Sequence, residues 1–232
     1  MKPRFSHQRT HALTLVEVLV VITVLVVLAA ILLPRFRPHA QPAQRLPCSN
    51  NLKQIGLACH IWAGDHGDKF PMQVSMTNGG AMELAATGDV TAIYLVLSNE
   101  LSTPKTLICP EDKKRLPAAT NFSNPQLKNK ISYFIGVDAT DTQPQMFLSG
   151  DDNLAVEAIP AKSGLLEFST NSSATWNYPR HTSYKSHFWT PANYKSVGYI
   201  SFADGSVEEA TSRELKNFLL QTGLATNRLA LP

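Results

Sequence analysis

The chain has 232 residues, of which 44% are apolar and 17% are charged. This composition suffices for one moderate hydrophobic core and excludes a disordered or fibrous chain. Three of the 21 basic side chains, those of Lys2, Arg4 and Arg9, lie within the first twelve residues, and the remaining 18 match the 18 acidic ones. No basic stripe is left to follow a phosphate backbone, which argues against nucleic-acid binding.

An apolar segment runs from Leu13 to Leu33. It contains neither Gly nor Pro, and Glu17 is its only charged residue. A helix of this length is roughly 30 Å long, which is about the thickness of the hydrocarbon core of a bilayer. The apolar core of a cleavable secretory signal is shorter, at about 7–15 residues. The segment therefore predicts a single transmembrane helix over residues 13–33.

The start of this apolar run carries a motif. The hexapeptide ALTLVE at residues 12–17 follows a short basic leader, residues 1–12. It resembles the processing motif of type IV prepilins and type II secretion pseudopilins, in which a small residue ends the leader and glutamate is fifth in the mature chain. The resemblance implies that a prepilin peptidase cuts between Ala12 and Leu13 and methylates the new amino group of Leu13. The chain departs from the commonest pattern, which has Gly and Phe at these two positions.

Glu17 has two interpretations. A carboxylate at the centre of a bilayer costs on the order of 3 kcal/mol or more, so such a residue usually has a partner. The resemblance implies that Glu17 pairs with the ammonium group of Leu13 in a neighbouring subunit. Alternatively, Glu17 lies within about 6 Å of the helix start and simply reaches the lipid headgroups. The surrounding motif favours the first interpretation.

Three later segments narrow the resemblance. They are CSNNLKQIG at residues 48–56, GDDN at 150–153 and FADGSV at 202–207. Together they resemble a branch of pseudopilin-like proteins abundant in planctomycetes and verrucomicrobia. Many of those proteins carry a histidine ten residues before the Asp-Gly pair, where this chain has Tyr194. The resemblance implies a protein of the bacterial inner membrane, with partners that are like subunits or other pseudopilins.

The orientation follows from the length of chain beyond the apolar run. Basic residues flank the run on both sides, so their bias is modest. About 200 residues follow it, and long domains cross membranes largely regardless of their charge. We therefore expect a single-pass protein with a cytoplasmic N-terminus and a periplasmic or extracellular domain over residues 49–232.

A proline-rich neck is predicted over residues 34–48. Each proline removes a helical hydrogen-bond donor and restricts the residue before it. We expect the first helix to end near Pro34 and a second helix to begin near Ser49 and to end at Gly64. A neck of this kind is typical of a flexible tether and disfavours a continuous helical spine. The prolines are Pro34, Pro38, Pro42 and Pro47.

The domain is predicted to be α+β, a pilin-like globular fold with a small antiparallel sheet and a C-terminal helix. Strand composition occurs at residues 131–137 and 165–168. Residues 199–208 predict a hairpin, because Asp-Gly at its centre tolerates the positive φ values of a tight turn. Thr211 and Glu214 fit a capping box that opens a helix ending near Gly223.

Three cysteines lie in a domain that we place in an oxidising compartment. Cys48 and Cys59 are too far apart along a helix to be joined. Cys48 with Cys109 is the preferred disulfide, and free thiols are the alternative. No cysteine and histidine spacing indicates a zinc site.

Oxygen-rich side chains around residues 138–153 allow a structural Ca²⁺ site, and major pseudopilins, which the chain resembles, can carry one. The same residue types also make turns by bonding their own backbone, and no EF-hand spacing is present. We favour the turn interpretation and expect no other cofactor. The candidate ligands are Asp138, Asp141, Asp151, Asp152 and Asn153.

No catalytic motif is present. The chain lacks a G-x-S-x-G elbow, a phosphate-binding glycine loop and an H-E-x-x-H helix, so we do not expect an enzyme. A group of aromatic residues is typical of core or loop packing, and would indicate a binding patch if part of it is exposed. The group comprises Trp176, Tyr178, Tyr184, Phe188, Trp189 and Tyr194.

Two functions therefore remain from different classes. The first is a structural subunit of a type II secretion pseudopilus or a type IV pilus-like filament. The second is a membrane-anchored surface-binding module, an adhesin or minor tip subunit that uses the prepilin pathway. The motif and Glu17 favour the first function, whereas the proline-rich neck favours the second.

Overall fold

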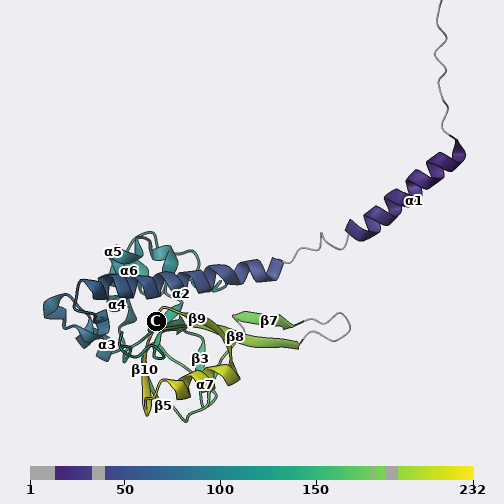
Figure 1. The fold of residues 1–232 in the computed structure, drawn as a ribbon. Helices are drawn as coiled ribbons and strands as arrows, with labels where there is room; N and C mark the ends of the chain where they lie inside the picture. The colour runs from purple at the N-terminus through teal and green to yellow at the C-terminus, as the bar shows by residue number, and fades with distance from the viewer. Residues whose placement is uncertain (1–13, 33–39, 179, 186–192) are drawn as a thin grey trace, which may run out of the picture. The chain divides into compact units, whose positions relative to one another are not determined.

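The structure is a computed structural model that describes residues 14–32, 40–178, 180–185 and 193–232 (Figure 1). The chain divides into two compact units, Met1–Ala40 and Gln41–Pro232. The first contains helix α1 (Leu15–Leu32), which lies within the predicted transmembrane segment, residues 13–33. Within the described part of the chain, no helix combines the length and apolarity needed to cross a bilayer.

Helix α2 (Ala40–Gly64) opens the second unit and corrects one prediction. The expected start near Ser49 is wrong, because the helix begins at Ala40 and continues through Pro47. Pro42 lies in the first turn, where the missing N–H would have had no helical partner. The predicted end at Gly64 is confirmed.

A layer of short helices follows α2. None of these was predicted, because each is too short to show a helical period in the sequence. They are η2 (Pro71–Gln73), η3 (Met76–Asn78), α3 (Met82–Ala86), α4 (Val90–Val96), α5 (Ser98–Leu101), η4 (Pro104–Leu107) and α6 (Asn124–Leu127).

The α+β class and antiparallel pairing are confirmed, but the sheet is larger than expected. Seven strands form the order β5-β10-β1-β2-β8-β7, with β9 paired to β8. They are β1 (Tyr133–Gly136), β2 (Phe147–Asp151), β5 (Gly164–Ser169), β7 (His181–Lys185), β8 (Asn193–Phe202), β9 (Val207–Thr211) and β10 (Thr226–Leu231). A second sheet contains β3 (Leu154–Val156), β4 (Ile159–Pro160) and β6 (Ala174–Trp176).

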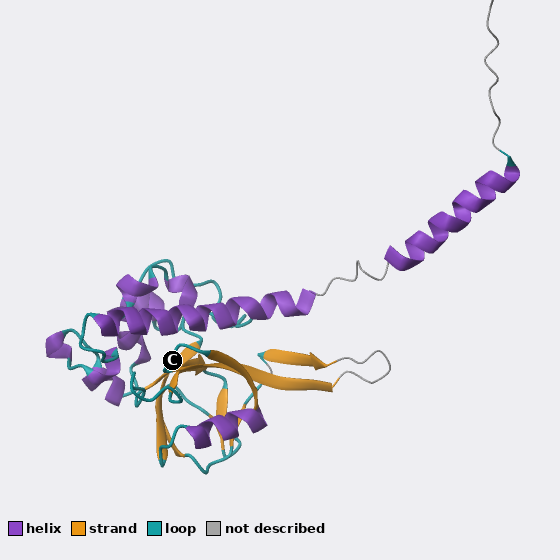
Figure 2. Cartoon of the chain, viewed as in Figure 1, coloured by secondary structure: helices purple, strands orange, loops and turns teal. Residues whose placement is uncertain are grey.

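Helices cover the main sheet on both faces, with α2 on one side and α7 (Ser212–Gln221) on the other (Figure 2). The side chains of β1 contact both helix layers. Tyr133 and Ile135 pack in the same hydrophobic cluster as Leu52 of α2. The intervening Phe134 packs in a second cluster with Leu215 of α7. Alternate side chains of a strand point to opposite faces, so both faces of this strand are buried.

Two predicted elements near the C-terminus are confirmed. Strands β8 and β9 form the expected hairpin, and Gly205 has the positive φ of +82° that its tight turn requires. Thr211 and Glu214 cap α7 reciprocally, as a capping box should. The helix is not the last element, however, because β10 follows it and inserts between β5 and β1.

Candidate functional site

The first candidate site is the start of α1. Glu17 Oε2 accepts hydrogen bonds from the Thr14 backbone N–H at 2.8 Å and from its hydroxyl at 2.9 Å. The Glu17 N–H donates back to Thr14 Oγ1 at 3.3 Å. This reciprocal pair is a capping box, and it places a carboxylate where the helix dipole favours negative charge.

The predicted cleavage point lies just before this capping box. Ala12 and Leu13 fall outside the described residues. Glu17 is fully exposed, and both bonds that it accepts from Thr14 use the same oxygen. The carboxylate can therefore take an added cation without losing its contacts to Thr14, because each carboxylate oxygen can accept more than one hydrogen bond.

Cys48 and Cys109 form a disulfide between α2 and the segment after η4, with their Cα atoms 5.1 Å apart. The bridge closes a sequence separation of 61 residues. Cys59 remains a buried free thiol, and burial, aided by the charge of Glu100, raises its pKa to about 12. Cys59 is therefore protonated and unreactive at neutral pH.

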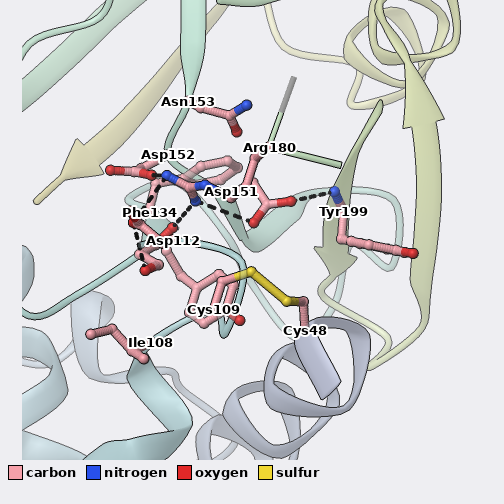
Figure 3. Close-up of polar contacts among 12 residues, drawn as sticks. Cys48, Ile108, Cys109, Asp112, Phe134, Asp151, Asp152, Asn153, Arg180 and Tyr199 are labelled. Atoms are coloured by element: carbon pink, nitrogen blue, oxygen red, sulfur yellow. Dashed lines mark hydrogen bonds and ion pairs between the residues drawn. A yellow bond between two sulfur atoms is a disulfide. The ribbon is translucent and has the colours of Figure 1, made fainter. Parts of the chain in front are cut away.

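Arg180 is the centre of a buried ionic cluster (Figure 3). Its Nη2 lies 2.5 Å from Asp152 Oδ1 and 3.2 Å from Asp112 Oδ2, and its Nη1 lies 3.4 Å from Asp151 Oδ1. Nη1 also donates to the Ser132 carbonyl at 2.9 Å. The side chains of Arg180 and Asp151 are 1% and 0% exposed, so these charges interact with little screening by water.

A second guanidinium extends the cluster. Arg115 Nη1 lies 2.8 Å from Asp112 Oδ2, and its Nη2 lies 2.6 Å from Asp152 Oδ2. Burial opposes ionisation of Asp112, but Arg180, the Ser132 hydroxyl and Arg115 outweigh burial and lower its pKa. Burial also disfavours the charged form of Arg180, and its three carboxylate neighbours instead raise its pKa. Asp112 and Arg180 are therefore kept ionised, despite their burial, by the opposite charges beside them.

The cluster ties together distant parts of the domain. Asp151 Oδ2 accepts the backbone N–H of Tyr199 on β8 at 2.8 Å, while its other oxygen faces Arg180. Asn153 Nδ2 donates to the Tyr178 carbonyl at 2.7 Å. The GDDN segment therefore joins β2, the base of β7 and the loop that holds Asp112. Its role in this structure is to position these elements.

The five candidate calcium ligands do not form one site. Asp138 pairs with Arg228, Asp141 lies 3.3 Å from His60 Nδ1, and Asp151 and Asp152 pair with Arg180. In the described residues, no group of three or more acidic, histidine or cysteine side chains could hold a metal ion. The arrangement instead matches carboxylates paired with basic side chains of the protein itself.

His60 and Asp141 form a histidine–carboxylate pair, with Nδ1 of His60 3.3 Å from Asp141 Oδ1. His60 Nε2, the nitrogen opposite Asp141, is buried and lies beside the Asp204-Gly205 turn. A general base must reach the proton that it abstracts from a substrate. The buried nitrogen is poorly placed for that task.

Two of the segments that carry the family resemblance meet at this turn. A Cβ on Gly56 of α2 would lie 3.3 Å from Ser201 Oγ and 3.7 Å from Gly205 Cα. Glycine therefore permits the close approach of α2 to the β8–β9 turn. Asp204 Oδ1 accepts the Ser206 N–H at 2.8 Å, which is a turn contact. The contacts of residues 48–56 and 202–207 at this turn are therefore packing and turn contacts that stabilise the fold.

The sequence patterns did not indicate Arg180, Asp112 or Arg115 as site residues. Arg180 lies 28 residues from Asp152 and 48 from Ser132 along the chain, so no local spacing reveals the cluster. The one signal was the acidic pair Asp151-Asp152 in a segment that becomes largely buried, because buried carboxylates require a cation.

Of the aromatic residues considered above, Trp176 is in the core and its Nε1 donates to the Ala210 carbonyl at 2.7 Å. Tyr178 is half-buried beside Arg180 and Lys114. Phe188 and Trp189 lie outside the described residues. The side chains of Tyr184 and Tyr194 lie outside them as well.

Comparison with known proteins supports the N-terminal site. Residues 7–33 match the model of the prokaryotic N-terminal methylation motif, so the chain has a prepilin-like N-terminus with the cleavage and methylation motif. Residues 40–85 match a family model described as a protein of unknown function, DUF1559. No curated protein and no solved structure matches the chain. The methylation motif implies prepilin-type processing and a membrane-anchored N-terminal segment.

Proposed function

We propose that the chain is a structural subunit of a type II secretion pseudopilus or a type IV pilus-like filament, without catalysis of its own. A prepilin peptidase cuts it between Ala12 and Leu13 and methylates Leu13. The apolar run over residues 13–33 then inserts into the bacterial inner membrane. The domain lies on the periplasmic or extracellular side, where an oxidising environment suits the Cys48–Cys109 disulfide.

The observation that carries this proposal is the exposed carboxylate of Glu17 at the start of an apolar helix. Unpartnered, this charge disfavours entry into lipid. The free amino group of Leu13 on a neighbouring subunit supplies the missing cation and aligns the two chains along the filament. The large apolar side chains of α1 from Leu15 to Leu28 are between 45% and 80% exposed, which leaves a wide apolar surface for like subunits.

A second function is supported by the division of the chain at Ala40. Pro34 and Pro38 lie between α1 and α2, whereas Pro42 and Pro47 lie within α2. A membrane-anchored surface-binding module, such as an adhesin or minor tip subunit, needs a tether of this kind. The two functions differ in whether Glu17 is needed beyond membrane insertion.

Variants of Glu17 separate the roles of this carboxylate. Glu17→Gln keeps a capping side chain but removes the charge, whereas Thr14→Ala removes the cap and keeps the charge. We expect Glu17→Gln and Glu17→Leu to abolish recovery in sheared filaments while membrane insertion stays intact. Thr14→Ala should still assemble. Normal incorporation of Glu17→Gln, measured by immunoblotting the sheared and membrane fractions, would rule out an assembly role for the charge.

A further inference from the structure

A short loop after η4, residues 113–117, displays lysines beside an apolar side chain. Its two lysines, Lys113 and Lys114, are exposed, and Leu116 is 43% exposed. Residues 105–130 carry six basic and two acidic side chains, whereas the whole chain carries 21 and 18. The loop is therefore part of a cationic segment, and exposed apolar and cationic side chains together indicate an interaction surface.

The ionic cluster holds this loop in place. Arg115 places its Nη1 2.8 Å from Asp112 Oδ2 and its Nη2 2.6 Å from Asp152 Oδ2. The backbone carbonyl of Arg115 accepts a hydrogen bond from Lys130 Nζ at 2.8 Å. The loop is thus fixed at its centre, while its two lysines face the solvent. A surface that is already ordered loses little conformational entropy when it binds a partner.

The loop also lies near the start of α2, where the linker from α1 enters the domain. Cys109, four residues before Lys113, is bonded to Cys48 of α2 (Figure 3). Cys48 is eight residues after Ala40, the first residue of α2, which is about 12 Å along a helix. The linker, residues 33–39, reaches at most about 25 Å. In a chain that α1 anchors, the loop therefore stays within reach of the bilayer surface.

We propose that residues 113–117 bind the anionic phospholipids of the membrane that anchors the chain. Lys113 and Lys114 contact phosphate groups, and Leu116 enters the boundary between headgroups and acyl chains. A soluble polyanion is bound by charge alone and gives the exposed leucine no role. The proposal rests on the proposed membrane anchor, and it does not depend on filament assembly.

The first test uses the full-length protein in nanodiscs of phosphatidylcholine, with and without phosphatidylglycerol. Acetylation of lysines, read by mass spectrometry, reports which side chains the lipid covers. We expect acetylation of Lys113 and Lys114 to fall at least threefold when phosphatidylglycerol is present, and to recover at high salt, which screens the charges. Lys162, after β4, and Lys216, on α7, are exposed controls and should be acetylated equally in both kinds of disc.

A fluorescent probe tests whether Leu116 enters the lipid. Leu116→Cys supplies the reactive thiol, since Cys59 is buried and the other two native cysteines are bonded to each other. A polarity-sensitive fluorophore on this cysteine should shift its emission to the blue in discs that contain phosphatidylglycerol. The same fluorophore on Ile159→Cys, at a 66% exposed position of β4, should not shift.

The two lysines are tested as a pair in the labelled Leu116→Cys protein. Lys113→Ala/Lys114→Ala should abolish the blue shift, whereas the matched control Lys162→Ala/Lys216→Ala should keep it. Thermal unfolding checks that each variant is folded. The acetylation measurement needs no substitution, so it carries the test if a variant unfolds.

Three results would overturn the proposal. They are equal acetylation of the two loop lysines in both kinds of disc, a blue shift that does not depend on phosphatidylglycerol, and equal losses in the test and control pairs. Protection of the loop lysines by soluble polyglutamate, but not by phosphatidylglycerol, would assign the loop to an acidic protein partner instead. A protein that fails to co-purify with either kind of disc refutes the membrane anchor itself, whereas one that co-purifies without protection refutes the lipid contact alone.

Discussion

The two units of the chain use apolar residues in opposite ways. Helix α1 has exposed apolar side chains around its circumference, from Val18 at 45% to Leu15 at 80%. Helix α2 buries one face completely, with Leu52 and Ile55 at 0%, and exposes the other. A helix that is apolar on all sides requires cover from lipid or other helices, whereas a one-sided helix is satisfied by its own domain. The domain can therefore be stable by itself, and α1 is the part that needs partners.

The same contrast applies to charge within the domain. Arg180 is buried among carboxylates, whereas Arg228 pairs with Asp138 while 41% of its side chain is exposed. Breaking a buried ion pair leaves an uncompensated charge, but breaking an exposed pair leaves charges that water can solvate. Variants of these two arginines therefore test whether the contribution of an ion pair to the free energy of unfolding depends on its burial.

The largest expected effect is that of Arg180→Met. It removes the guanidinium from beside the buried carboxylates of Asp151 and Asp112, and we expect a loss of about 3–5 kcal/mol in the free energy of unfolding. Arg228→Met is the matched control and should cost less than about 1 kcal/mol. Urea denaturation followed by circular dichroism measures both. Equal losses in the two variants would contradict the importance that we give to burial.

The disulfide should have the next largest effect. Replacing Cys48 and Cys109 together by alanine removes a crosslink across 61 residues, and we expect a loss of about 2–4 kcal/mol. A reducing agent should lower the stability of the wild-type protein to that of the variant and leave the variant unchanged. Insensitivity of the wild-type protein to reduction would show that the crosslink contributes little.

Acid should weaken the ionic cluster in a predictable pH range. The pKa of Asp112 is lowered in the folded protein, so its contribution is complete above the ordinary aspartate value, about 4, and is lost as pH falls below it. The stability difference between the wild-type protein and Asp112→Asn should therefore be constant near neutral pH and shrink below about pH 4. Urea midpoints between pH 3 and 7 measure this, and a constant difference would refute it.

The smallest expected effect concerns the cap of α7. Thr211→Ala removes the hydroxyl that accepts the Glu214 N–H, and should cost about 1 kcal/mol. Thr142→Ala, at an exposed loop position, is the control and should change stability by less than about 0.5 kcal/mol. Thermal unfolding of the two variants, compared side by side, measures the difference. A loss in Thr142→Ala as large as that in Thr211→Ala would show that the cap has no special weight.

The parts of the fold that were predictable from sequence depend on local chemistry. The β8–β9 turn needs Asp-Gly, and the α7 start needs Thr211 and Glu214, so both are visible in a few adjacent residues. The start of α2 differs from the predicted start near Ser49, which rested on the four prolines before it. Packing of the residues after Pro47 outweighs the one hydrogen bond that Pro47 removes.

Long-range features were not predictable in the same way. Strand β10 was missed because its place between β5 and β1 depends on pairing with residues far away in sequence. The Arg180 cluster was missed for the same reason, since its members come from three separate segments. The candidate calcium ligands were grouped because they are close in sequence, but the structure distributes them among Arg228, His60, Arg180 and the Tyr178 carbonyl.

The central claim is that the chain enters the prepilin pathway and that α1 acquires its partners only after cleavage. The most direct measurement is intact mass and N-terminal sequencing of the protein from its native membrane, with and without the prepilin peptidase. The account predicts a chain that begins at methylated Leu13 when the peptidase is present, and an uncut chain when it is absent. A chain that keeps Met1 or Lys2 in the presence of the peptidase would contradict the account.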